Sequence, residues 1–391
     1  MELAKGIHRT AFAFRGYNVA NLGRTSELIS IPEYRPILLP FLQEAAEVCS
    51  ETIGRHVDLV ARVEANEETT LEDYAEAIAL IVAVEQAHLA ILKQCHGVDY
   101  SEAAFAFGFS LGEISALVAG GSYLMKDALR IPLCLSADGI ELARDVTLGI
   151  LFCRREELSV ERVNQLLLKI NSEGEGVIGV STHLGPNSVL VMGSGNTMEM
   201  LKARLADIAP KGIHLRCNEH RWPPLHTPIV WEKNFTTRAG RMLHTLPGGF
   251  KAPKPQVFSL VTGQISYDDF NARTHMIDWV DHTQKLWDAI YEVLSTGVKS
   301  VIHVGPAPNI IPATFDRLAS NVEAQTKISR RMQAMSAAIE RPWLKNLLPR
   351  RAALLRAPKI QHIILEDWLL DHAPSQHKPT TQAVDAPSVV S

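Results

Sequence analysis

Short apolar runs alternate with longer segments of helical periodicity along most of the chain. Residues 10–14 (TAFAF) and 103–107 (AAFAF) have the length and the continuous apolar character of strands that are buried on both faces. Two further runs, 255–261 and 299–304, also predict strands. Helical spacing predicts helices over 40–63, 71–93, 113–119, 127–145 and 278–294. This alternation is typical of an α/β fold with a mainly parallel sheet.

The middle of the chain has a different pattern. Residues 150–153, 176–182 and 188–193 alternate like strands, and helical patterns occupy 160–170 and 197–208. The order strand, helix, strand, strand, helix predicts a small ferredoxin-like α+β insertion over residues 148–210. The core is then formed by residues 1–147 and 211–322.

The C-terminal part is rich in basic residues. Its cations lie among apolar and tryptophan residues and comprise Arg330, Arg331, Arg341, Lys345, Arg350, Arg351, Arg356 and Lys359. We expect a basic helical extension over residues 323–372, whose charged face is either simply solvated or docks an acidic partner. Residues 373–391 are rich in Pro, Thr and Gln, and we expect a disordered tail.

Composition and charge narrow the classes of function. The 391 residues carry a formal net charge of −4, which gives no reason to expect binding to nucleic acid or to a membrane surface. No uninterrupted apolar run reaches the roughly 18 residues that span a bilayer, and no signal-peptide pattern opens the sequence. The five cysteines are widely spaced without CxxC pairs, which argues against a disulfide framework or a zinc site. We therefore expect a cytoplasmic enzyme without a metal.

The strongest local signal is the sequence GFSLG at residues 108–112. It follows the apolar run that ends at Phe107 and precedes a helical pattern that stops at Gly120-Gly121. Strand, G-x-S-x-G and helix together predict a nucleophile elbow, a sharp turn that presents Ser110 at the amino end of a helix. Free amides and the helix dipole at that end favour an oxyanion.

A serine needs a base within hydrogen-bond reach, and fifteen histidines compete for that role. His226 stands out because it lies in PPLHTP, a stiff loop at the start of a helix. His220 lies on the same loop and is the second candidate. His303 falls within a strand predicted to be buried and is interpreted as structural.

These residues carry a family resemblance. The run GFSLGEISALVAGG resembles the GHSLGE-x-x-AL-x-x-AG signature of malonyl-CoA:acyl carrier protein transacylases and of polyketide synthase acyltransferase domains. In the order and approximate spacing of that family, PPLHTPIV is similar to its histidine segment, VLVMGSGNTMEML to its ferredoxin-like subdomain and GVKSVIHVGPAPNII to its Gly-Pro segment. The resemblance covers about residues 10–320 and points to a divergent, stand-alone member.

The resemblance implies a Ser/His dyad that transfers acyl groups by a ping-pong mechanism. Ser110 would attack the thioester of an acyl-CoA while His226, oriented by a backbone carbonyl, takes its proton. The phosphopantetheine thiol of an acyl carrier protein would then collect the acyl group. The oxyanion would be held by the amide of Leu111 and by an amide of the first loop, where Gly16 and Tyr17 stand in place of the family's Gly-Gln.

Two departures from the family pattern bear on the substrate. Malonyl-specific members carry an arginine roughly 25 residues after the serine, which forms a bidentate pair with the malonyl carboxylate. The corresponding position here is Leu135, and Arg130 and Arg144 lie several residues away. The usual histidine before the serine is Phe109. An unpaired carboxylate in an apolar pocket costs several kcal/mol, so we expect a short or medium acyl group without a free carboxylate.

Three classes of function remain open from the sequence. The first is acyl transfer to a carrier protein in fatty-acid or polyketide synthesis, by a monomer that binds acyl-CoA as substrate and no cofactor. The second is hydrolysis of thioesters or esters by the same dyad. The third is a non-catalytic interaction module, which the altered first loop and the missing arginine would permit.

Overall fold

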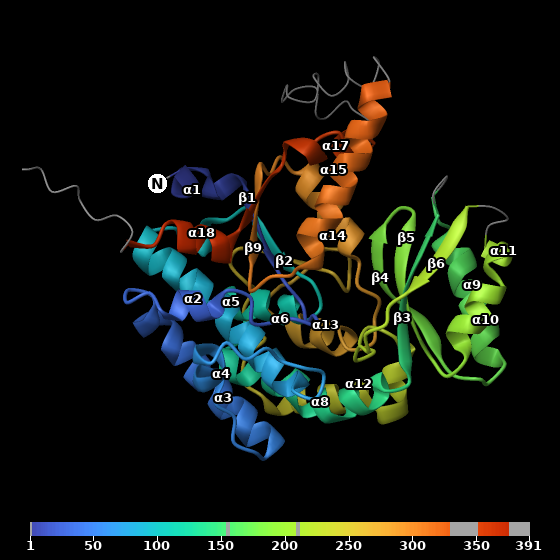
Figure 1. Ribbon diagram of the computed structural model, residues 1–391, viewed down its shortest axis with the longest axis horizontal. Helices are drawn as coiled ribbons and strands as arrows, with labels where there is room; N and C mark the ends of the chain where they lie inside the picture. Colours follow the sequence, from blue (N-terminus) through green and yellow to red (C-terminus); the bar gives the residue numbers. More distant parts are fainter. Residues whose placement is uncertain (1, 154–156, 209–211, 329–350, 375–391) are drawn as a thin grey trace, which may run out of the picture.

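The computed structural model describes residues 2–153, 157–208, 212–328 and 351–374 (Figure 1). Its main sheet has six strands in the order β10-β9-β1-β2-β7-β8. All neighbours in this sheet are parallel except β7 and β8. The strands are β1 (Thr10–Phe14), β2 (Phe105–Gly108), β7 (Val257–Ser259), β8 (Gln264–Ile265), β9 (Ser300–Val304) and β10 (Gln361–Ile364). The predicted α/β architecture with a mainly parallel sheet is confirmed.

Both faces of the main sheet are covered, which explains why its strands read as continuous apolar runs. In β1, Phe12 and Phe14 pack into one core, whereas Ala11 and Ala13 pack into a second core on the other face. The second core includes residues of α14 (Leu286–Ser295), α15 (Ile310–Ile328) and α17 (Arg351–Leu354). The first core is lined by helices α2 (Thr25–Ile29), α3 (Arg35–Ile53), α4 (Leu59–Glu64), α5 (Tyr74–His96), α6 (Leu111–Ala119), α7 (Met125–Ala128), α8 (Arg130–Ala143), α12 (Phe235–Thr245), α13 (Ala272–Asp278) and α18 (Leu365–Asp371).

Helix α5 is the most apolar of the long helices. Within the described residues it is the one helix whose length and composition would suffice to cross a bilayer, and 94% of that stretch is buried inside the protein. Its neighbours are α3, α6 and α8. The apolar character of α5 is therefore explained by its central place in the first core.

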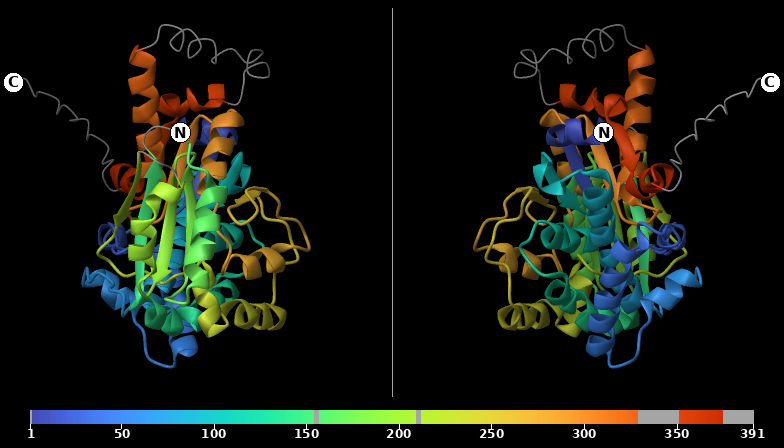
Figure 2. Two further views of the ribbon diagram at one scale, coloured as in Figure 1. Left: turned by 90° about the vertical axis from the view of Figure 1, so that its right-hand side faces the viewer. Right: turned by 90° about the vertical axis from the view of Figure 1, so that its left-hand side faces the viewer.

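A second, four-stranded antiparallel sheet lies beside the main body (Figure 1) and faces the viewer in the left-hand view of Figure 2. Its order is β4-β5-β3-β6, formed by β3 (Val146–Cys153), β4 (Ile178–Gly185), β5 (Ser188–Ser194) and β6 (Ile213–Cys217). Helices α9 (Val160–Ser172), α10 (Thr197–Ala203) and α11 (Leu205–Ile208) accompany it and share its separate apolar core. The element order β-α-β-β-α-β is that of a ferredoxin-like unit. Because β6 pairs with β3, this unit extends to Cys217, beyond the predicted boundary at residue 210.

The C-terminal segment differs from the predicted basic helical extension. Residues 361–364 form β10, which pairs in parallel with β9 and makes the edge of the main sheet. Helix α18 then packs Leu365 and Leu369 into the first core, and Ala373 is also buried there. The helical prediction is therefore wrong for 361–364, because their apolar residues complete a sheet. Most of the predicted basic cations and nearly all of the predicted tail fall at 329–350 and 375–391, outside the described residues.

Two predicted helices are also divided differently. The stretch 40–63 comprises the end of α3, which begins upstream at Arg35, and the separate α4. The stretch 278–294 starts with the last residue of α13 and continues as a helix only in α14, because residues 279–285 leave the helical path. Their backbone groups bond to other elements instead: Val280 O accepts from His226 N, and Gln284 N donates to Ser181 O.

Replacing Leu369 by alanine tests whether the C-terminal segment is part of the core. Leu369 is buried on α18, so Leu369→Ala should lower the free energy of unfolding by about 2–5 kcal/mol. Urea unfolding measures the change. Leu168→Ala is the matched control, because Leu168 is 70% exposed on α9 and its loss should cost less than about 0.5 kcal/mol. Equal stability of the two variants would show that α18 contributes nothing to the core.

Candidate active site

Ser110 lies on the sharp turn between β2 and α6. Its backbone has φ 53° and ψ −119°, an uncommon conformation for any residue other than glycine. Leu111 is the first residue of α6, so its amide is among those that a helix leaves without an intrahelical partner. The turn thus places a hydroxyl beside the amino end of a helix.

The two glycines of the GFSLG sequence make this turn possible. A Cβ on Gly108 would lie 2.0 Å from Gly112 O, and a Cβ on Gly112 would lie 2.4 Å from Phe14 O in β1. Any larger residue at either position would push the helix away from the sheet. The spacing of glycines two residues on either side of Ser110 is therefore required by close backbone packing.

His226 meets Ser110 from the loop before α12. Its Nε2 lies 2.7 Å from Ser110 Oγ, and its Nδ1 lies 2.7 Å from Trp279 O. Because a carbonyl oxygen only accepts, Nδ1 carries the proton, and Nε2 is left to accept from the serine hydroxyl. The backbone amide of His226 also donates to Val280 O at 2.8 Å. The ring is therefore fixed in the tautomer that a general base requires.

Burial sets the charge state of this histidine. It lowers the pKa of His226 from 6.5 to about 4, although the hydrogen bond to Trp279 O and the charge of Asp281 act in the opposite direction. The imidazole is consequently neutral at physiological pH and available to accept a proton.

The first loop, after β1, comes close to the serine turn. A Cβ on Gly16 would lie 2.6 Å from Phe109 O, so this approach requires a glycine. The guanidinium of the buried Arg15 donates hydrogen bonds to Gly16 O (2.8 Å) and Ala20 O (3.1 Å) in this loop. It also donates to Pro306 O (2.6 Å) in the loop after β9. The amide of Tyr17 therefore belongs to a loop that is fixed next to the serine turn.

A cavity of about 320 Å³ opens over Ser110 and His226. Its wall contains Tyr17, Tyr74 and Trp222, whose rings meet edge to face with centroids 4.7 Å apart for the two tyrosines and 5.8 Å for Tyr17 and Trp222. The remaining lining is mainly apolar and includes Phe109, Leu148, Ile150, Leu190, Met192, Leu225 and Ile310. Besides Ser110 and His226, its polar lining residues are Asn18, Ser181, Asn218 and Asn309, and none of its described lining residues is an arginine or a lysine.

The structure brings together most of the predicted site residues but not all. Ser110, His226, Phe109, Gly16 and Tyr17 line the cavity, and Leu111 follows Ser110 directly. Leu135 does not line it: this side chain is buried in the first core, because the face of α8 that carries it turns inward. The prediction of Leu135 as a pocket residue is therefore wrong.

The alternative candidates lie elsewhere. Arg130 binds Glu51 at 2.7 Å, and Arg144 lies 3.9 Å from Glu72, both on the surface rather than in the cavity. His220 is exposed on the loop and makes no contact with Ser110. His303 is buried in β9 and stacks on His362 with ring centroids 5.2 Å apart, in keeping with its structural interpretation.

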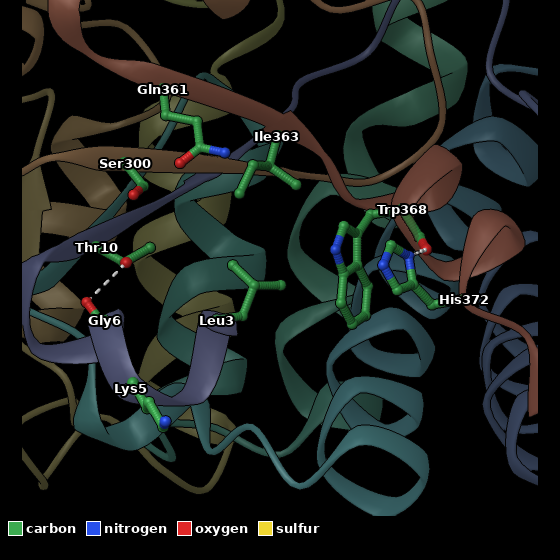
Figure 3. Close-up of a pocket in the computed structure, with 9 residues that line it drawn as sticks. All are labelled: Leu3, Lys5, Gly6, Thr10, Ser300, Gln361, Ile363, Trp368 and His372. Carbon is green, nitrogen blue, oxygen red and sulfur yellow. Dashed lines mark hydrogen bonds between the residues drawn. The ribbon is translucent and has the colours of Figure 1, made fainter. Parts of the chain in front are cut away.

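A second and larger cavity, of about 640 Å³, lies at the amino ends of the strands of the main sheet, between α1 (Glu2–Gly6) and α18 (Figure 3). It is lined by the first residues of three strands, Thr10, Ser300 and Gln361, whereas Ser110 follows the carboxyl end of β2. The hydrogen bonds there join Thr10 Oγ1 to Gly6 O and His372 Nδ1 to Trp368 O. Its described residues thus hold no hydroxyl–imidazole pair.

Several residues of the site are invisible to local sequence patterns. Trp279 falls within the helix predicted over 278–294, yet its carbonyl orients His226. Tyr74 looks like any apolar residue at the start of α5, and Trp222 like part of a proline-rich loop. The proline loop around 222–228 and the break in helical spacing near 279–285 were the available signals. In the described part of the chain, no three His, Cys, Asp or Glu side chains gather as metal ligands do.

Comparisons with known proteins bear on the sequence and the fold. The chain is 26% identical over 276 residues to hispidin synthase of Neonothopanus nambi. The aligned region covers 70% of this chain but only 15% of that relative. No protein-family model matches the chain.

Solved structures share the fold at lower identity. The acyltransferase domain from module 8 of the salinomycin polyketide synthase has a TM-score of 0.62 at 20% identity, covering 79% of this chain and 67% of that one. The malonyl-CoA:acyl carrier protein transacylase of Xanthomonas oryzae pv. oryzae has a TM-score of 0.61 at 19% identity, covering 78% and 90%. The resemblance inferred from the sequence motifs is thereby confirmed.

Proposed function

We propose that this chain, a divergent relative of the malonyl-CoA:acyl carrier protein transacylases and polyketide synthase acyltransferases, moves an acyl group from acyl-CoA to the phosphopantetheine thiol of an acyl carrier protein. The observation that carries the proposal is the Ser110–His226 pair, with Oγ 2.7 Å from Nε2 and Nδ1 held by Trp279 O. A hydroxyl bonded to an oriented, neutral imidazole is an activated nucleophile.

The first half-reaction forms an acyl-enzyme. Ser110 Oγ bonds to the thioester carbon while its proton passes to His226 Nε2, and the carbonyl oxygen takes up negative charge. The amides of Leu111 and Tyr17 stabilise that oxyanion in the proposed mechanism. The carbon–sulfur bond then breaks, and the departing CoA sulfur takes the proton from His226.

The second half-reaction regenerates the serine. The thiol of the carrier gives its proton to His226, its sulfur bonds to the acyl carbon, and Ser110 Oγ leaves with the proton returned by His226. In this scheme the turn at Ser110 acts as a nucleophile elbow. The lowered pKa of His226 leaves the base neutral at the start of each step, and it also makes His226 a weaker proton acceptor than a free imidazole.

The cavity supports an acyl group without a charged end. A free carboxylate there would find no arginine or lysine among the described lining residues, and desolvating it without a partner is costly. The aromatic and aliphatic wall instead offers apolar surface, for which each buried methylene contributes roughly 0.8 kcal/mol. We therefore propose a short or medium alkanoyl group in place of malonyl.

Competition between hexanoyl-CoA and malonyl-CoA tests the substrate proposal. We expect hexanoyl to be loaded on Ser110 at least about tenfold faster, since an unpaired carboxylate costs more than the roughly 1.4 kcal/mol that tenfold requires. Mass spectrometry of the intact protein, with both thioesters at equal concentration, reads out the ratio of the two adducts. Faster loading of malonyl would reject the apolar-pocket proposal while leaving the acyl-enzyme intact.

The distinction between transfer and hydrolysis is tested with the carrier. We expect free CoA to appear in a single burst with acyl-CoA alone and in steady turnover once a carrier protein with its phosphopantetheine arm is added. Sustained release of CoA without the carrier would instead show that water attacks the acyl-enzyme and that the protein is a hydrolase.

A further inference from the structure

One segment, residues 279–284, bonds to both peptide groups of Ser110. The backbone amide of Ser110 donates to Gln284 Oε1 at 3.3 Å, and the indole Nε1–H of Trp279 donates to Ser110 O at 2.9 Å. Ser110 has a positive φ, a conformation that persists only where neighbouring groups enforce it. The side chains of Trp279 and Gln284 supply such groups on either side of the strained residue.

The bond from Trp279 reaches the proposed oxyanion site through a planar peptide. Ser110 O and the amide of Leu111 belong to the same peptide unit, so fixing the direction of the carbonyl also fixes the direction of the N–H on its opposite side. A donor on the carbonyl further polarises that N–H. Trp279 is itself buried, so this hydrogen bond lies in a weakly screening environment.

The same segment holds the base. Trp279 O accepts from His226 Nδ1, and Val280 O accepts from His226 N. His226 also has a positive φ, of 65°. Nucleophile, oxyanion peptide and base are therefore all bonded to residues 279–284.

Gln284 also connects this segment to the antiparallel sheet. Its backbone amide donates to Ser181 O, and its carbonyl accepts from His183 N, both at 2.8 Å. Its side chain is buried, and Nε2 has no hydrogen-bond partner among the described residues. A buried unpaired amide nitrogen is destabilising, so packing alone does not account for a glutamine here.

We propose that Trp279 and Gln284 are positioning residues. Gln284 fixes the peptide group before Ser110 and Trp279 fixes the one after it, so that the N–H of the second, the amide of Leu111, faces the oxyanion. The inference rests on the proposed function and adds to it a role for two side chains. Neither residue touches the acyl group in this scheme, since neither lines the cavity. Both act through the nucleophile turn.

Trp279→Phe is the main test, because it removes the indole donor and keeps an aromatic ring against His226. Losing an oxyanion-hole donor outright lowers rates by 10²–10³, so misaligning one should lower the rate by about 10- to 100-fold. The readout is the rate of labelling by a serine-directed fluorophosphonate, together with kcat and KM for hexanoyl-CoA. We expect labelling and kcat to fall, with KM and the acid limb of the pH profile unchanged, since the backbone bond to His226 remains.

Controls separate positioning from damage to the fold. Trp287→Phe makes the same chemical change at a half-buried position on α14 and should label at the wild-type rate. Gln284→Met keeps the volume and removes the acceptor of Ser110 N, with Gln86→Met on α5 as its matched control. If Trp279→Phe does not fold, Gln284→Met decides.

The outcomes distinguish this inference from the proposed function. The positioning role alone is overturned if the wild-type protein transfers acyl groups while a folded Trp279→Phe or Gln284→Met variant labels at the wild-type rate. It is also overturned if the labelling rate of Trp287→Phe falls as much as that of Trp279→Phe. Wild-type protein that labels with fluorophosphonate but accepts no acyl-CoA would contradict the proposed transfer, and the labelling rates would still decide the role of Trp279 and Gln284.

Discussion

Ser110→Ala should abolish the acyl-enzyme. Its hydroxyl is the only group bonded to His226 Nε2 in the described structure, and no other nucleophile shares that base. We expect loading from acyl-CoA to fall by at least about 10³-fold, as when the nucleophile of a serine enzyme is removed. Fluorophosphonate labelling and the intact-protein mass after incubation with acyl-CoA both measure the effect.

The control for this change is Ser115→Ala. Ser115 lies on the same helix, α6, is buried and does not line the cavity. We expect this variant to load acyl groups at the wild-type rate. An adduct that survives in Ser110→Ala would show that another residue carries the acyl group.

His226→Asn should be the second most damaging change. Asparagine tolerates the positive φ at this position but cannot act as the base, so the fold should survive. General-base catalysis contributes about 10²–10⁴, and we expect acylation to slow by that factor. His220→Asn on the same loop is the matched control, because His220 is exposed and does not contact Ser110. Comparable loss in both variants would argue against His226 as the base.

The pH dependence follows from the burial of His226. Below its pKa of about 4 the imidazole is protonated and accepts no proton, so acylation should decline with a midpoint near pH 4 instead of near 6.5.

The same pKa shift of His226 affects stability. Between pH 6.5 and 4 the unfolded chain binds a proton that the folded chain does not, so this group's contribution to stability falls as the pH falls. Urea unfolding measures the free energy of unfolding at pH 7 and at pH 5. The difference between these two values should be smaller for His226→Asn than for the wild type.

Local patterns in the sequence were sufficient to single out Ser110 and His226, whose side chains the structure brings together. Ser110 is marked by a buried strand, two glycines at fixed spacing and a helix, all within residues 103–121. The turn is therefore encoded next to the residue that it presents. His226 is marked by the rigidity of the prolines around it. Their distance of 2.7 Å required the tertiary structure, since 116 residues separate them.

Other features depend on contacts that no local pattern records. Counting 25 positions from Ser110 to Leu135 gives a place along α8 but not the face that turns to the cavity. Trp279 fits an amphipathic helix equally well, and its bonds to His226 and Ser110 join segments far apart in the sequence. Strand β10 was hidden because its four residues follow a long basic stretch and pair with a strand some 60 residues earlier.

The central claim is that Ser110 carries the acyl group between CoA and a carrier thiol. Its most direct test is the mass of the intact protein after incubation with hexanoyl-CoA, measured before and after a carrier protein with its phosphopantetheine arm is added. We expect one hexanoyl adduct on Ser110 that persists in the absence of the carrier, disappears when the carrier is added and reappears on the carrier. No adduct, or an adduct that disappears equally fast without the carrier, would contradict it.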